Sequence, residues 1–104
     1  MTRYYLAGPM TGYQNFNYPA FHAAAAILRS KGMHIENPAE NPEPPCGSWG
    51  AYMRMAITQL LKCEAIILLP GWENSRGATL EVHIASMVGM TVYPLEYFEG
   101  LVNG

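Results

Sequence analysis

The sequence predicts an α/β fold: a three-layer Rossmann-like (flavodoxin-like) domain built on a four-stranded parallel sheet in the order 2-1-3-4. Two observations lead to this prediction. Short apolar segments typical of buried strands alternate along the chain with segments of helical periodicity. Because a helix separates each pair of consecutive strands, the strands run parallel and the crossovers are right-handed. A chain of 104 residues, half of them hydrophobic, is sufficient for a single domain spanning residues 1–104.

The first half of the chain contains two strands and one helix. Residues 3–7 are the first strand. Residues 18–31 form a helix, because Ala23–Ala26 has high helix propensity and Gly32 is a typical stop. Residues 33–36 are the second strand.

A proline-rich loop at residues 37–47 leads into the second half. Its four prolines exclude a helix interior or a central strand. Ser48 is a candidate N-cap for a helix ending at Lys62, whose apolar residues recur at helical spacing: Tyr52, Met53, Ala56, Ile57, Leu60 and Leu61. The remaining elements are a third strand at 65–69, a third helix at 75–88, a fourth strand at 90–93 and a helical turn at 95–101.

The best candidate for a ligand site is the pair of loops after the first and third strands. The loop Gly8–Gly12 follows the first strand, and the turn at Pro70 and Gly71 leads from the third strand to a helix opening near Ser75. In the predicted strand order these loops are neighbours at the topological switch point, where α/β sheets bind ligands. Free amides and the helix dipole favour an anion at such a helix start.

Glu81, on the helix after the second of these loops, is the candidate catalytic residue. A carboxylate beside an open crevice can attack an anomeric carbon or act as a general base. Gly77 and Ala78 leave space in front of it, and position 85, one turn later, is an alanine rather than a basic partner. The alternative is an ordinary surface glutamate.

Residues around the two loops are candidates for holding a ligand. Ser75, Arg76 and Gly77 can bind a phosphate or carboxylate, although an N-cap serine and a solvated arginine would look the same. Tyr5 either reaches the ligand or is a buried strand tyrosine. The other candidates are small loop residues and aromatic rings able to stack on a base: Gly8, Pro9, Met10, Phe16, Gly71 and Trp72, with Trp49 as a further ring.

Composition argues against several classes of function. All eight acidic residues are glutamates, so the aspartate-rich clusters of Mg²⁺ and Ca²⁺ sites cannot form, and histidines and cysteines are too scattered for zinc. We therefore expect no metal and no cofactor. A formal charge of −2 argues against duplex nucleic acid. No apolar run reaches the roughly 20 residues of a membrane helix, and the two cysteines are expected to be free thiols of a cytoplasmic protein without a membrane partner.

An ordered set of motifs resembles the nucleoside 2-deoxyribosyltransferase-like superfamily, in its small branch of phage and bacterial proteins. The motifs cover nearly the whole chain: YLAGPMTG at residues 5–12, NYPAF at 17–21, CEAIILLPGW at 63–72, SRGA at 75–78 and Glu81.

The resemblance implies roles for three residues. Glu81 would be the nucleophile that takes the sugar at C1′, Tyr5 would orient it, and Ser75 would contact the sugar 5′ end or a 5′-phosphate. It also implies a small-molecule nucleoside or nucleotide as partner and a homo-oligomer. Exposed aromatic candidates favour an oligomer too: Trp49, Tyr52 and Trp72.

One position departs from the superfamily pattern: Ala56 stands where relatives typically have an aspartate. Loss of a general acid typically costs ~10²–10⁴-fold in rate. Two hypotheses follow. The first is an N-glycosidic-bond enzyme, a deoxyribosyltransferase or a nucleoside or nucleotide N-hydrolase, in which Glu73 or a partner subunit supplies the proton and Ala56→Asp raises the rate. The second is a catalytically impaired nucleotide-binding module that senses or sequesters a nucleotide.

Overall fold

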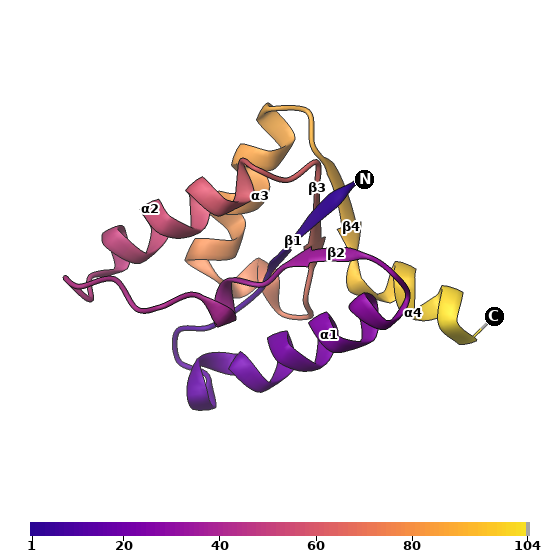
Figure 1. The fold of residues 1–104 in the computed structure, drawn as a ribbon. Coiled ribbons are helices and arrows are strands. Elements are labelled where there is room, and N and C mark those ends of the chain that lie inside the picture. The colour runs from indigo at the N-terminus through magenta and orange to yellow at the C-terminus, as the bar shows by residue number, and fades with distance from the viewer. Residues whose placement is uncertain (104) are drawn as a thin grey trace.

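The computed structural model describes residues 1–103, with side chains for residues 1–99, and contains a parallel sheet covered by helices on both faces (Figure 1). In chain order the elements are β1 (Arg3–Ala7), α1 (Tyr18–Ser30), β2 (His34–Glu36), α2 (Trp49–Leu60), β3 (Ala65–Leu68), α3 (Arg76–Met87), β4 (Thr91–Pro94) and α4 (Leu95–Asn103). Short 3₁₀ segments lie at Gln14–Asn17, Pro38–Glu40 and Trp72–Asn74.

The strand order β2-β1-β3-β4 and the parallel direction of every pair confirm the predicted fold class. In the central pair, Tyr5 lies opposite Ile66 and Ala7 opposite Leu68. Each predicted strand agrees with the structure to within a residue at either end. The register brings the carboxyl ends of β1 and β3 to the same edge of the sheet, which is where the ligand site was expected.

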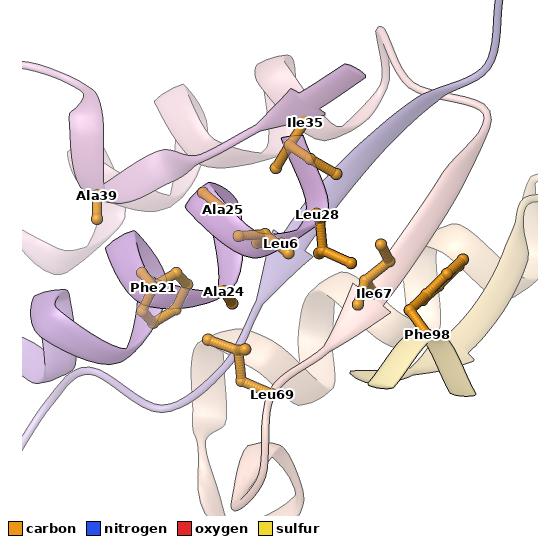
Figure 2. Packing of buried hydrophobic residues seen from close by; sticks show 10 residues of the cluster. All are labelled: Leu6, Phe21, Ala24, Ala25, Leu28, Ile35, Ala39, Ile67, Leu69 and Phe98. Carbon is orange, nitrogen blue, oxygen red and sulfur yellow. The ribbon is translucent and has the colours of Figure 1, made fainter. Parts of the chain in front are cut away.

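One face of the sheet is covered by α1, with α4 at the far end of the same layer (Figure 1). Figure 2 shows the ten buried residues packed there, all of them hydrocarbon or aromatic: Leu6, Phe21, Ala24, Ala25, Leu28, Ile35, Ala39, Ile67, Leu69 and Phe98. Alanines on the inward face of α1 let the helix approach the strands closely. This layer is a continuous apolar core.

The opposite face is covered by α2 and α3. Because successive strand side chains point to opposite faces, Tyr5 and Ala7 of β1 face these helices while Leu6 faces α1. Small residues line the facing sides of both helices, among them Ala56, Ala78 and Ala85. They leave room on this face for polar side chains and for a cleft.

The helix ends follow the predicted caps, with one correction. Ser48 and Ser75 are the N-caps of α2 and α3, and each accepts a hydrogen bond from the amide three residues later, at Ala51 and Ala78. The expected apolar face of α2 included Leu61, but the helix ends at Leu60. Leu61 is its C-cap and is 54% exposed, because the chain turns there toward β3.

No helix within residues 1–103 combines the length and the apolar character that crossing a membrane requires.

Candidate active site

The loops after β1 and β3 are in contact, as the strand order predicted. A Cβ atom on Gly71 would lie 3.4 Å from Pro9 Cγ and 2.9 Å from the Tyr13 hydroxyl. Gly71 also has φ +86°, which favours glycine. A Cβ on Gly8 would lie only 2.8 Å from Leu69 Cβ. Both glycines are therefore explained by close packing of the two loops.

A small cleft, partly open to solvent, lies beside these loops between β1, α2 and α3. Six of the predicted site residues line it: Tyr5, Gly8, Met10, Ser75, Gly77 and Glu81. Gly8 and Glu81, from opposite sides of the switch point, thus contribute to one cleft.

Glu81 and Tyr5 form a buried pair in the wall of this cleft. Tyr5 Oη donates a 2.5 Å hydrogen bond to Glu81 Oε2, and the two residues are 1% and 6% exposed, respectively. Burial raises the pKa of the Glu81 carboxyl to about 7, although the Tyr5 hydrogen bond acts in the opposite direction. Burial, followed by the nearby Glu81 charge, raises the pKa of Tyr5 well above its usual value. Tyr5 therefore stays a neutral donor while Glu81 changes charge near neutral pH.

The start of α3 forms another part of the cleft wall. Ser75 Oγ accepts from the Ala78 amide at 3.1 Å, so the serine is an N-cap, and it lines the cleft as well. A Cβ on Gly77 would lie 3.2 Å from Met53 Sδ, and this close approach joins α3 to α2. The Arg76 guanidinium stacks on the Trp49 indole, 3.9 Å from the ring centroid. Arg76 is therefore held beside the cleft rather than extended into solvent.

Five predicted site residues do not line the cleft. The Pro9 carbonyl accepts from Asn17 Nδ2 at 2.9 Å, and Gly71 forms the turn after β3. Trp72 packs against the apolar core of the α2–α3 face, and Arg76 lies over Trp49. Phe16 lies in a neighbouring groove that shares Met10, Thr11, Trp49 and Tyr52 with the cleft. It is exposed and has φ +53° within a left-handed run of three residues, Asn15–Asn17.

Of the three aromatic side chains expected to be exposed, two are not. Trp49 is 37% exposed, whereas Tyr52 and Trp72 are half-buried. Trp49 and Tyr52 line the cleft, a position that the sequence analysis did not assign to Tyr52. Helical spacing placed Tyr52 on the inward face of α2. That spacing does not distinguish a core position from a cleft position.

Glu73, the candidate within this chain to replace the aspartate expected at position 56, does not line the cleft. Ala56 is 1% exposed and packs in the apolar cluster that includes Tyr5. Glu73 is exposed on the 3₁₀ segment Trp72–Asn74 and is not among the residues that line the cleft. Among the described residues of the lining, Glu81 is the single acidic side chain.

This chain matches one protein-family model and resembles a solved structure of the same fold. A family model described as "Domain of unknown function (DUF4406)" matches residues 2–94. A similar solved structure is the 2-deoxyribosyltransferase from the psychrotolerant bacterium Bacillus psychrosaccharolyticus, described as a biocatalyst for the synthesis of antiviral and antitumoral nucleosides. The match has a TM-score of 0.70 and 19% sequence identity, and it covers 88% of this chain and 70% of the other. The two chains share a fold. No curated protein matches this chain in sequence.

Proposed function

The chain belongs to the DUF4406 family. We propose, from the residues of the Glu81 cleft, that it breaks the N-glycosidic bond of a deoxynucleoside or a deoxynucleoside 5′-monophosphate. One observation carries the proposal: a buried glutamate, oriented by a tyrosine, lines a cleft at the switch point of the sheet. A carboxylate that is buried, directed and perturbed in pKa is more typical of a reactive group than of a structural one. The sequence resemblance assigns nucleophilic attack to this same residue.

In the proposed reaction, one Glu81 carboxylate oxygen attacks C1′ of the sugar. The new O–C1′ bond forms as the C1′–N bond breaks, and the electron pair of that bond leaves with the base. Attack by water on the resulting ester would give the free sugar and make the protein a hydrolase. Attack by a second base would make it a transferase.

The Tyr5 hydroxyl suits the positioning role in this reaction. By donating to Glu81 Oε2, it fixes the carboxyl plane and leaves the other oxygen for attack. The hydrogen bond also offsets part of the cost of an ionised carboxylate in a buried place. Only the ionised form is nucleophilic, so turnover is expected to rise as the pH increases through about 7.

We propose that the start of α3 binds the 5′ end of the substrate. The Ser75 hydroxyl lines the cleft, the free amides of the first turn favour an anion, and stacked Arg76 adds a positive charge nearby. These features fit a 5′-hydroxyl or a 5′-phosphate. The solved structure with the same fold is described as a 2-deoxyribosyltransferase, which supports a nucleoside as the substrate class.

Ala56 favours a second function, a nucleotide-binding module that senses or sequesters its ligand. The methyl group of Ala56 occupies the position where the resemblance leads us to expect an acid, and among the described residues of the cleft lining Glu81 is the single acidic group. With no acid to protonate the departing base, the rate would fall ~10²–10⁴-fold. Binding would be unaffected.

A panel of deoxynucleosides and their 5′-monophosphates, incubated at pH 8 and analysed for free base by chromatography, tests both functions. We expect slow release of base by the wild type and a loss on the order of 10⁴-fold in Glu81→Gln, which keeps the size of the side chain but is not a nucleophile. Ala56→Asp is expected to raise the wild-type rate.

Calorimetry on the same three proteins separates the alternatives. Nucleotide binding without release of base by any of the proteins would support the binding module. A wild type that neither binds nor cleaves any member of the panel would contradict both functions.

A further inference from the structure

Tyr52 presents a hydroxyl group in the cleft that the proposed chemistry has not yet used. Its side chain extends from α2 and lines both the Glu81 cleft and the adjoining groove. The hydroxyl donates to Met10 Sδ at 3.0 Å. A thioether is a weak acceptor, so a ligand oxygen or ring nitrogen would replace it at little cost.

Two further hydroxyl groups of the cleft wall, those of Tyr5 and Ser75, are already engaged. Tyr5 holds Glu81, and Ser75 caps α3 where the sugar 5′ end is proposed to bind. Tyr52 comes from α2, across the cleft from α3, and its own partner is a group that can be exchanged.

The surroundings of Tyr52 keep its hydroxyl protonated. Burial is the main cause of a raised pKa, and the charge of Glu81 raises the pKa further. Tyr52 therefore donates a hydrogen bond without giving up its proton.

We propose that on substrate binding the Tyr52 hydroxyl leaves the Met10 sulfur and donates its hydrogen bond to the departing heterocycle. The inference rests on the function proposed above and deepens it. As the Glu81–C1′ bond forms and the C1′–N bond breaks, the electron pair moves into the heterocycle, and an oxygen or ring nitrogen of that ring becomes more negative. A hydrogen bond to that atom strengthens in the transition state. No proton is transferred in this step, and solvent protonates the base after it has left.

This role suits a site in which position 56 is an alanine. Without an acid to protonate the base as it leaves, stabilising the negative charge on the base is the remaining way to assist its departure. The proposal therefore predicts a preference for substrates whose bases leave readily as anions and carry an acceptor atom within reach of α2.

The experiment compares Tyr52→Phe with the wild type and with Tyr97→Phe. Tyr97 is an exposed tyrosine of α4, outside the cleft, and serves as a control for losing a phenolic hydroxyl. Each protein is assayed with two deoxynucleosides whose bases differ in acidity. We expect Tyr52→Phe to lower kcat by about 10- to 100-fold with KM little changed. The loss should be larger for the less acidic base, because that base depends more on the hydrogen bond.

Each outcome bears on one of the two proposals. Equal losses for both substrates, or a kcat matching that of Tyr97→Phe, would overturn the role of Tyr52 while Glu81→Gln still tests the reaction itself. Thermal unfolding of Tyr52→Phe is expected to match the wild type closely, because the lost bond is to a weak acceptor. A wild type without turnover would overturn the proposed function, and with it the role of Tyr52.

Discussion

The two faces of the sheet are packed differently, although the same strands supply both. On the α1 face, Leu6 and Ile67 contact a layer of hydrocarbon and aromatic side chains, and nearby buried Asn37 is committed to the turn at Pro38–Glu40. On the α2–α3 face, the strand residue next to Leu6 is Tyr5, which holds a buried carboxylate. The alternation of a single strand thus separates a face that stabilises the fold from a face that holds a reactive group.

The difference has an energetic consequence. Among the described residues, the buried cluster of the α1 layer contains no ionisable side chain, so its contribution to the free energy of unfolding depends on packing. The α2–α3 layer has a built-in cost, because ionising Glu81 inside it is unfavourable. With a pKa of about 7 against an ordinary 4.5, and about 1.4 kcal/mol per pH unit, the cost above neutral pH is about 3 kcal/mol. Stability and reactivity are therefore expected to respond to different substitutions.

The largest expected effect on stability is on the apolar face. Leu28 of α1 is fully buried, and Leu28→Ala would leave a cavity in the apolar layer. We expect a loss of about 4 kcal/mol in the free energy of unfolding, measured by urea denaturation. Nucleotide affinity, measured under conditions where the variant is folded, should stay at the wild-type value. A parallel loss of affinity would mean that the two faces are coupled.

The next largest effect is a pH dependence of stability that comes from Glu81 on the α2–α3 face. The unfolded chain releases the Glu81 proton near pH 4.5, whereas the folded protein holds it up to about pH 7. This group therefore favours folding at low pH, and the advantage is lost as the pH rises from 4.5 through 7. We expect the free energy of unfolding to fall by about 3 kcal/mol across this window.

Glu81→Gln is the matched control for this pH dependence, because its side chain does not titrate. Its stability should vary little between pH 5 and 8, and it should exceed the wild type at pH 8. Glu36 and Glu40 have lowered pKa values, through hydrogen bonds from Gln59 and Arg29 respectively, so their contribution is lost only as the pH falls below the usual carboxyl range. The same slope in both proteins would show that Glu81 is not the group responsible.

The apolar face was easier to predict from the sequence than the cleft. Strand order followed from the alternation of elements, and the apolar runs identified β1 and β3 to within a residue. Glu81 was found because a lone carboxylate on that helix had no basic partner. Tyr52 was missed as a cleft residue, because helical spacing reports only that a side chain faces inward. The left-handed backbone at Asn15–Asn17 was not predicted, because none of these residues is a glycine, the usual signal for positive φ.

The burial of Glu81 also shows what local patterns leave out. Its hydrogen bond joins residues 76 positions apart in the chain, and its pKa depends on burial in the folded protein and on that hydrogen bond. Neither property belongs to the helix alone. The sequence identified Glu81 as a candidate, but its hydrogen bond to Tyr5 and its raised pKa result from the fold.

The smallest predicted effect is a difference between two serines of the α2–α3 face, one of which is expected to affect stability alone and the other both stability and ligand binding. Ser48 and Ser75 are equivalent N-caps: each hydroxyl accepts from an amide three residues on, at 3.1 Å in both cases. Replacing either by alanine removes one cap, so each variant should lose about 1 kcal/mol of stability. Ser75 differs because it also lines the Glu81 cleft. Ser75→Ala should therefore weaken binding of a deoxynucleoside 5′-monophosphate by about 5- to 10-fold in calorimetry, the effect of one lost hydrogen bond, whereas Ser48→Ala should not. If both variants lost the same stability and neither lost affinity, Ser75 would be a cap alone, and the 5′ end of the ligand would have to bind elsewhere in the cleft.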